Sequence, residues 1–397
     1  MKKILILAGS YFQIPVIKYA KEHGYFVITC DNRPDNPGHK IADKYINVST
    51  TDMEGVLKIA TENKIDGILA YASDPAAQTA GYVSEMLGLP GNSYDTVKTL
   101  GIKSEYRQFL KKNDFNYPNF VVLKDGEYKA GAIKELKYPL IVKPSDSAGS
   151  KGVSRVKHQE EIPAAIGKAL PFSRNKEIII EEYVQKVGPQ IGGEAYAYKG
   201  KLVMMCLGDQ KVNDKSEYIY VPIGMTFPAQ IEKEENKLIK TELQRIISLS
   251  DFQTGALNLE IMRTAKNKIY IMEIGPRSGG NLLPELMNYT CDYNVAGLSV
   301  EHAIGNDVVS PKVFDIKEGY YAYYAIHSQK KGIFNGLEKS SLANSWIIEE
   351  QIFYDIGQEY NIFKHSGYVI GIWLLRFSSK KDMDMFFNSP CEYYNIR

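Results

Sequence analysis

Two glutamates in the middle of the chain are the first candidates for chemistry. The stretch "ALNLEIMRTAKNKIYIME", residues 256–273, is predicted to form two strands that turn at Lys266-Asn267. A hairpin centred on that turn places Glu260 directly opposite Glu273, with Cβ atoms ~4.5–5.5 Å apart. Like charges repel in that position, and a divalent cation would remove the conflict, since hard oxygen ligands suit Mg²⁺ held together with substrate phosphates. A solvated pair on a half-exposed sheet is the alternative.

An arginine follows the second glutamate in the segment "GPRSGGN", residues 275–281. The guanidinium of Arg277 can clamp a transferring phosphoryl group, because its planar fork presents several donors to phosphate or carboxylate oxygens. We therefore expect Arg277 to act in catalysis and to contact substrate.

A second candidate is a loop suited to phosphate, in "YPLIVKPSDSAGSKGVSRV", residues 138–156. Lys143 ends an apolar run, a loop of serines and glycines follows, and another short strand comes next. Glycine N–H groups and serine hydroxyls can surround phosphate oxygens, and the lysine supplies a cation. The lysine precedes the glycines, so the loop is not a P-loop, and the kinase GxGxxG is also absent. An exposed, flexible hairpin is the alternative.

The first third of the chain alternates strand and helix patterns, which predicts a parallel sheet with helices on both faces. Ser10 and Asp74 follow predicted strands, and in open α/β sheets ligands bind at the carboxyl ends of the strands. A structural alternative is that Ser10 makes a tight turn and Asp74 caps the helix that contains Pro75. The first turn, "AGSYFQIP", lacks GxGxxG, which argues against a dinucleotide-binding Rossmann domain.

From about residue 115 the predicted strands come in groups, which is typical of an α+β arrangement with antiparallel pairs. We therefore expect an α/β plus α+β chain in three regions. Residues 1–112 form an N-terminal α/β domain, residues 113–310 form two nucleotide-binding lobes, and residues 311–397 form a small β-rich lobe that completes the site.

The composition fits a globular chain with a sizeable core. Of its 397 residues 44% are hydrophobic and 24% are charged, and the net charge is +1. The near-neutral balance indicates neither a nucleic-acid nor a membrane-surface partner. No apolar run reaches the ~18 residues of a transmembrane helix. The four cysteines show no metal or redox spacing, so we expect a cytoplasmic protein with reduced thiols.

Taken together, the strand lysine, the glycine loop and the paired glutamates resemble the ATP-grasp superfamily. The chain is most similar to the branch with a preceding α/β domain, which contains biotin carboxylase, carbamoyl-phosphate synthetase, the purine carboxylating ligases and the L-amino-acid ligases. "GYFVITCDNRPDNPGHKIADKYI", residues 24–46, and "GIKSEYRQFLKKNDFNYPNF", residues 101–120, also match this pattern. The resemblance covers nearly the whole chain and implies an ATP-grasp fold with ATP and Mg²⁺ (or Mn²⁺) as cofactors.

The resemblance also implies roles for individual residues. In "IIIEEYV", residues 178–184, it implies an interlobe hinge that meets adenine, and it places a ribose-binding glutamate at Glu194. Glu260 and Glu273 match the magnesium ligands. The residues expected to bind the nucleotide are Lys103, Lys143, Ser150, Gly152, Glu181, Tyr183, Val184 and Glu194.

One position departs from the family pattern. The family usually reads E-x-N-P-R, where the asparagine is a third metal ligand, whereas this chain reads "EIGPR" with Gly275. The departure leaves open whether one or two magnesium ions bind. Asn258 shares the face of Glu260 by the period-two rule and is a plausible substitute ligand.

The expected activity is that of an ADP-forming carboxylate–amine ligase. Lys143 and Arg277 would act in catalysis as a substrate carboxylate attacks the γ-phosphorus, and the acyl phosphate would then react with an amine. A carboxylating ligase that uses carboxyphosphate and a non-catalytic nucleotide-binding protein are the alternatives. The expected partners are small-molecule carboxylate and amine substrates, and a homodimer is compatible with this interpretation. The residues expected to contact substrate are Ser10, Asp74, Lys211 and Arg277.

Overall fold

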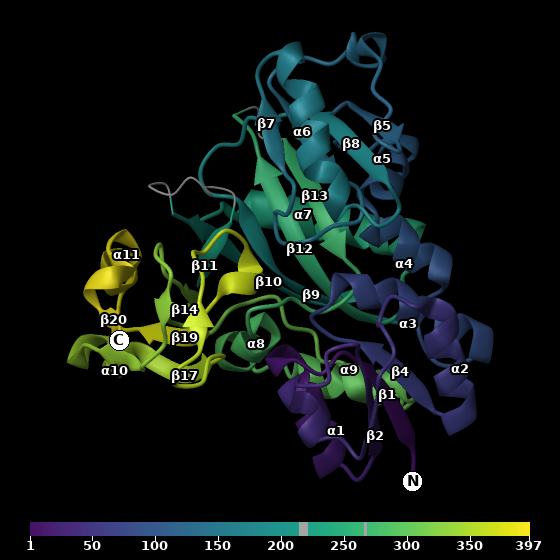
Figure 1. Ribbon diagram of the computed structural model, residues 1–397, viewed down its shortest axis with the longest axis vertical. Coiled ribbons are helices and arrows are strands. Elements are labelled where there is room, and N and C mark those ends of the chain that lie inside the picture. Colours follow the sequence, from purple (N-terminus) through teal and green to yellow (C-terminus); the bar gives the residue numbers. More distant parts are fainter. Residues whose placement is uncertain (214–220, 266–267) are drawn as a thin grey trace.

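The structure is a computed structural model that describes residues 1–213, 221–265 and 268–397 (Figure 1). The predicted turn at Lys266-Asn267 lies outside the described residues. The N-terminal part lies at the bottom of Figure 1, the sheet that contains β5–β8 lies at the top, and the C-terminal elements lie at the left.

The N-terminal part contains a parallel sheet with the strand order β3-β2-β1-β4, as the alternation of strands and helices predicts. Its strands are β1 (Lys3–Leu7), β2 (Phe26–Cys30), β3 (Lys44–Ile46) and β4 (Gly67–Ala70). Its helices are α1 (Ile14–Glu22), α2 (Met53–Asn63) and α3 (Asp74–Leu87). Apolar side chains of β1, β2 and β4 pack with α2 and α3 in one core cluster, whereas no residue of the edge strand β3 is fully buried. Helices α4 (Tyr94–Gly101) and α5 (Lys103–Lys112) follow.

A four-stranded antiparallel sheet comes next, with the strand order β5-β8-β6-β7. Its strands are β5 (Phe120–Lys124), β6 (Leu140–Pro144), β7 (Ser154–Val156) and β8 (Glu177–Glu182). Helix α6 (Ile162–Ala169) packs its apolar residues against this sheet. The sheet brings the end of β6, where Lys143 lies, beside β8, where Glu181 lies.

The largest sheet has eight strands in the order β13-β12-β9-β10-β11-β14-β19-β17. Its strands are β9 (Ile191–Tyr198), β10 (Lys201–Val212), β11 (Pro222–Phe227), β12 (Gly255–Arg263), β13 (Ile269–Gly275), β14 (Tyr320–Ile326), β17 (Ile347–Ile352) and β19 (Gly371–Phe377). All of its pairings are antiparallel, which confirms the grouped-strand prediction. The sheet runs across residue 310, so the three-region division stays a proposal.

Helices cover both faces of the large sheet. Helix α7 (Lys233–Leu249) packs on the β9, β10, β12 and β13 end through one apolar cluster. Helices α8 (Leu283–Cys291) and α9 (Val295–Ala303) belong to a second cluster on the other face, which also reaches α1 and β1. This shared core joins the N-terminal sheet to the large sheet.

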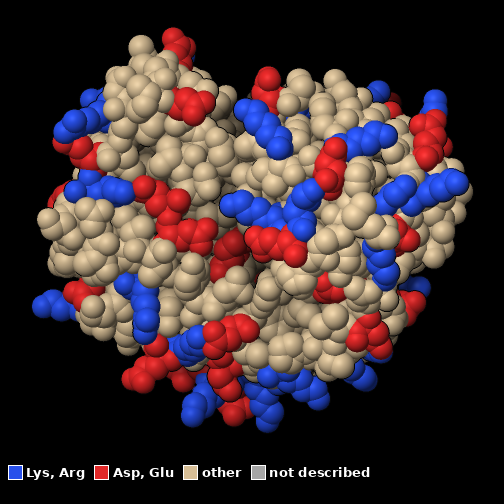
Figure 2. All heavy atoms as spheres, turned by 90° about the horizontal axis from the view of Figure 1, so that it is seen from below, with Lys and Arg blue, Asp and Glu red and all other residues tan. Residues whose placement is uncertain are grey.

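The remaining C-terminal elements are short. They are β15 (Gly332–Ile333), β16 (Leu337–Lys339), α10 (Ser341–Trp346), β18 (Glu359–Tyr360), α11 (Lys380–Asn388) and β20 (Tyr394–Ile396). Within the described ranges, no helix has the length and apolar character that crossing a membrane requires. On the face seen in Figure 2, acidic and basic side chains intermingle.

Candidate active site

The β12–β13 hairpin has the predicted pairing at its centre. Glu260 pairs directly with Glu273, and Asn258 pairs with Gly275. A bulge between Glu260 and Ile261 shifts the register by one residue. The pairing predicted from the sequence therefore holds from Asn258 to Glu260 and is shifted from Ile261 onwards. Bulges of this kind re-aim side chains next to functional sites.

Two lysines surround the carboxylate of Glu273. Lys143 Nζ lies 3.2 Å from Glu273 Oε1, and Lys103 Nζ lies 3.2 Å from Oε2. Burial by itself would raise the pKa of Glu273, but Lys103, Lys143 and then Arg107 outweigh it and lower that pKa to about 2. Glu273 is therefore an anion at neutral pH, held by the two cations that the sequence assigned to the nucleotide.

Glu260 has the opposite electrostatic environment. Its carboxylate accepts a hydrogen bond of 3.0 Å from Gln190 Nε2. Burial, followed by the charge of Glu273, raises the pKa of Glu260 to about 7, against the opposing effect of the lysines. The opposed carboxylates therefore carry less than two negative charges at neutral pH.

This donor set fits a magnesium ion that is shared with a nucleotide. Within the described ranges there is no group of three or more His, Cys, Asp or Glu side chains placed to hold a metal. In Mg²⁺ sites whose other ligands are phosphates and water, the protein usually supplies one or two carboxylates. Glu260 and Glu273 would hold the ion, with Asn258 in reach along the same strand.

A buried arginine, which the sequence reasoning missed, organises the lysines. Arg107 Nε donates to Glu181 Oε2 at 2.9 Å, and Lys143 Nζ lies 2.7 Å from Glu181 Oε1. Arg107 also donates from Nη1 to Met272 O at 2.6 Å. The position of Arg107 in α5, four residues after Lys103, is the sequence signal that could have found it, because such residues share a helix face.

These contacts limit the predicted role of Glu181. Both of its carboxylate oxygens are used by cations, so only its backbone remains to meet adenine. In the hinge, Tyr183 N donates to Pro139 O at 2.9 Å, and the guanidinium carbon of Arg155 lies 4.0 Å from the centroid of the Tyr183 ring. Val184 is half-buried. The adenine contact of this hinge stays a prediction.

The glycine loop lies over the first lysine. Lys103 Nζ donates to Ser147 O at 2.7 Å, and Ser150 has a left-handed backbone with a φ of 59°. Gly152 has a φ of 72°, and a Cβ there would come within 3.0 Å of Ala169 Cα in α6. Gly152 is therefore required by the packing of the loop on α6, independently of any phosphate.

The structure does not support the ribose role of Glu194. The hinge meets β12 at its turn end, where Lys186 bridges to Thr264, whereas Glu194 pairs with Asn258 on the far side of Glu260. Ribose lies between the base and the phosphates of a nucleotide, so its ligand should lie on the hinge side of the metal pair. Glu194 is instead fully buried and accepts a hydrogen bond of 2.9 Å from Gly279 N. Burial raises its pKa well above the usual range.

Arg277 connects the hairpin to the N-terminal sheet. Its Nη2 pairs with Asp74 Oδ2 at the start of α3, and its Nη1 donates to Ser278 O at 2.8 Å. Its Nε is buried and has no hydrogen-bond partner among the described residues. The structure thus brings two of the expected substrate residues together, and a donor of the guanidinium is left unused.

The other two residues predicted to contact substrate, Ser10 and Lys211, lie in different places. Ser10 lies at the carboxyl edge of the N-terminal sheet, where its hydroxyl donates to Gln13 Oε1 at 2.7 Å. Gln13 Nε2 in turn donates to Tyr71 O at 2.6 Å. Lys211 lies on the face of the large sheet opposite to that of Glu260, with Nζ 5.8 Å from the ring centroid of Phe387. Strand alternation thus turns the Lys211 side chain away from the face of Glu260, which argues against the predicted substrate contact.

A buried acid beside the N-terminal sheet also went unpredicted. Tyr71 donates from its hydroxyl to Glu285 Oε1 at 2.8 Å, across the contact between β4 and α8. Burial raises the pKa of Glu285 to about 7. Both residues lie far apart in the sequence, and neither is part of a motif.

Comparisons with known proteins agree with this geometry. Residues 97–282 match the family described as D-ala D-ala ligase C-terminus. The N-terminal section of the carbamoyl phosphate synthase large chain of Methanopyrus kandleri is 23% identical over 308 residues, which cover 72% of this chain and 52% of that protein. This chain spans about half to three-fifths of the length of the first curated relatives that it matches.

Solved structures share the fold along the whole chain. The L-amino acid ligase from Bacillus licheniformis superposes with a TM-score of 0.81 at 20% identity, covering 100% of this chain and 98% of that one. The biotin carboxylase domain of 2-oxoglutarate carboxylase from Hydrogenobacter thermophilus, crystallised with MgADP and bicarbonate, superposes with a TM-score of 0.78 at 17% identity, covering 100% and 90%.

The chain therefore has the ATP-grasp fold that these neighbours share, and its residues 97–282 match a ligase domain of that fold.

Proposed function

We propose that this protein is an ATP-dependent carboxylate–amine ligase that works through an acyl phosphate and releases ADP and phosphate. The observation that carries the proposal is the direct opposition of Glu260 and Glu273, with Lys103 and Lys143 on the second carboxylate. This arrangement gathers metal ligands and phosphate-binding cations at one point.

The two lysines have a specific part in this proposal. In the structure they neutralise Glu273, at 3.2 Å each. When phosphate oxygens enter, Lys103 and Lys143 turn to them and leave Glu273 free for the metal. A Mg²⁺ ion bound there would offset the charge of the terminal phosphates and of the transferred phosphoryl group.

Arg277 is proposed to bind the carboxylate that attacks, or the acyl phosphate that forms. It is the nearest arginine past the metal pair along β13, and its pairing with Asp74 holds it at the carboxyl edge of the N-terminal sheet. Ser10 and Tyr71 belong to the same edge. A substrate that lies between this edge and the hairpin would present its carboxylate to the γ-phosphorus, which is a matter of positioning and electrostatics.

The arrangement of positive charge favours attack at the γ-phosphorus. Lys143 and the glycine loop hold the middle of the triphosphate, while the metal pair and Arg277 act on its far end. An adenylating enzyme would concentrate charge on the α-phosphorus instead. A carboxylating ligase, which activates bicarbonate, remains the second candidate because the Hydrogenobacter neighbour was crystallised with that anion.

Three wider features of the protein belong to the same proposal. The first is the division into residues 1–112, 113–310 and 311–397. The second is that the substrates are small molecules, with a homodimer as the assembly. The third is a cytoplasmic location, which the free thiols of the four cysteines support.

Trapping with hydroxylamine tests the proposal. The protein is incubated with Mg-ATP, hydroxylamine and one acid at a time from a panel of amino acids, other carboxylates and bicarbonate. The expected result is a hydroxamate with one carboxylate class and an equal amount of ADP. AMP and pyrophosphate would contradict the acyl phosphate, and ADP formed only with bicarbonate would favour the carboxylating ligase.

A further inference from the structure

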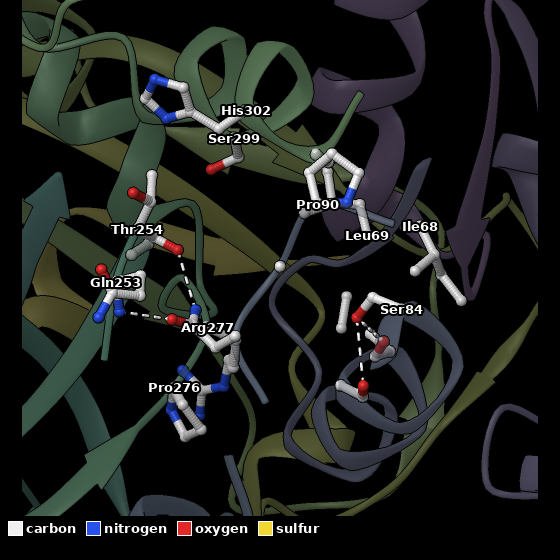
Figure 3. Close-up of a pocket in the computed structure, with 18 of the residues that line it drawn as sticks. Ile68, Leu69, Ser84, Pro90, Gln253, Thr254, Pro276, Arg277, Ser299 and His302 are labelled. Atoms are coloured by element: carbon white, nitrogen blue, oxygen red, sulfur yellow. Dashed lines mark hydrogen bonds between the residues drawn. The ribbon is translucent and has the colours of Figure 1, made fainter. Parts of the chain in front are cut away.

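A cavity lies at the seam between the N-terminal sheet and the large sheet, away from the opposed glutamates. We call it the seam cavity; its volume is about 290 Å³. Figure 3 shows Leu69, Ser84 and Pro90 on one side of it, across from Thr254 and His302. We propose that the seam cavity binds a small uncharged molecule and that this molecule acts on the Arg277–Asp74 ion pair.

The charged residues that line the cavity are already paired within the protein. Lys199 Nζ lies 2.7 Å from Asp307 Oδ2, and Arg277 pairs with Asp74. Each lining charge is neutralised by a partner of opposite sign, and the Nε of Arg277, which has no hydrogen-bond partner among the described residues, is itself buried. An ionic ligand would therefore find no counter-charge and would lose its hydration on entry. The lining therefore selects against both anions and cations.

The lining histidine is also satisfied. His302 Nδ1 lies 2.9 Å from the Tyr196 hydroxyl, and its Nε2 lies 2.7 Å from Val308 O. Both ring nitrogens are thus used inside the protein. His302 offers the cavity the face of a ring and not a hydrogen-bonding nitrogen.

The polar groups on the two walls are bonded to the protein as well. Ser84 Oγ donates to Ala80 O at 2.6 Å, and Asn92 Nδ2 donates to Thr254 O at 2.9 Å. Asn92 Oδ1 accepts from Gln253 N at 2.7 Å. Apolar contact is what the lining has left to offer, and it comes from Leu69, Ala77, Ala80, Pro90, Val97 and Phe252. The fitting ligand has an apolar, ring-sized body, since binding pockets of ~300 Å³ are the smallest that hold such molecules.

The position of the cavity couples it to the active site. Helix α3 begins at Asp74 and lines the cavity one and two turns later with Ala77 and Ala80. The opposite wall contains Arg277 and its neighbours Pro276 and Ser278. A molecule between these walls touches both elements that hold the ion pair. It changes the pair only if it binds better to one spacing of the walls than to another.

The test uses indole as the probe, titrated by ligand-observed NMR into the full chain without nucleotide. Indole is expected to bind, and Ala80→Phe, which fills the cavity from α3, should weaken binding by about tenfold or more. Ser299→Leu fills it from α9 and should act alike. Ala164→Phe, at an exposed position on α6, is the matched control and should bind indole as the natural protein does.

Three results would overturn the site. One is the absence of indole binding to the natural protein, and another is equal binding by Ala80→Phe, Ser299→Leu and Ala164→Phe. The third is that indole-3-acetate or tryptamine, the charged relatives of indole, binds as tightly as indole. The coupling has its own test, because linkage is reciprocal: Asp74→Asn should change the affinity for indole by about threefold or more. An unchanged affinity in folded Asp74→Asn would remove the coupling. This inference does not depend on the proposed ligase activity.

Discussion

The guanidinium of Arg277 rests against Gly275. A Cβ atom at Gly275 would lie 3.0 Å from Arg277 Cζ and 3.1 Å from Asp74 Oδ1. Both distances are tighter than ordinary contacts, so a side chain at residue 275 would displace the ion pair. Gly275, which departs from the family pattern, lacks the amide ligand of the usual asparagine. It also leaves the space that the guanidinium of Arg277 occupies.

Gly275→Asn is expected to reduce activity and not to add a metal ligand. The new side chain would push Arg277 away from Asp74, at a cost of about 1–3 kcal/mol. The measurements are the ligase rate and the affinity for Mn²⁺ with ADP. Gly167→Asn, at an exposed glycine of α6 with open space around its Cβ position, is the control. Tighter Mn²⁺ binding together with higher activity in Gly275→Asn would show that the position still serves the metal.

Metal binding should depend on nucleotide. Lys103 and Lys143 each lie 3.2 Å from Glu273, so a free ion must compete with both cations. Mn²⁺ alone is expected to bind at least about tenfold more weakly than Mn²⁺ with ADP, whose phosphates draw the lysines away. Electron paramagnetic resonance of free Mn²⁺ measures both affinities. Equal affinities would mean that Lys103 and Lys143 do not compete with the metal ion for the carboxylate of Glu273.

Arg107→Met should destabilise the fold. Arg107 is fully buried and neutralises Glu181, so its removal leaves a buried carboxylate with Lys143 alone. The expected loss is about 3–5 kcal/mol in the free energy of unfolding, measured in urea. Combining it with Glu181→Gln should recover part of that loss, because the uncompensated charge is gone. Strict additivity of the two changes would contradict the ion-pair explanation.

The buried acid Glu285 should make stability depend on pH. Burial raises its pKa from 4.5 to about 7. Between these values the unfolded chain releases the proton while the folded chain keeps it. The free energy of unfolding therefore falls as pH rises through this window, by an amount on the order of 3 kcal/mol. Glu285→Gln keeps an acceptor for Tyr71 but cannot ionise.

Urea unfolding of both proteins checks this sign. The stability of Glu285→Gln relative to the natural protein should increase from about pH 5 to about pH 8. A difference that is constant with pH would mean that Glu285 ionises normally in the folded state.

The sequence was sufficient where local pattern decides the structure. Period-two alternation and the predicted turn placed Glu260 opposite Glu273, because the register of a hairpin is set by residues close together in the sequence. The bulge that shifts Ile261 was not foreseen, because the sequence contains no signal for where an extra residue is inserted. Likewise the βα rhythm of the first region predicted the parallel sheet.

The unsupported and the missed contacts all join distant segments. Glu194 was placed by motif position and Lys211 was expected to contact substrate, yet the side of the metal pair and the face of the sheet decide what each can touch. The partners of Arg107 lie on β8 and β13, far from α5 in sequence. Such burial and pairing depend on how the sheets pack, which residue spacing within one segment does not determine.

The opposed glutamates are the centre of this account, and Glu273→Gln tests them most directly. The measurement is the rate of ADP release with Mg-ATP and the substrate that the hydroxylamine trap identifies. Glu160→Gln, at an exposed position, is the control. The account predicts a loss of about a hundredfold or more for Glu273→Gln, with its unfolding transition retained, because charge neutralisation by the metal is worth several kcal/mol. Full ADP release by folded Glu273→Gln would contradict it.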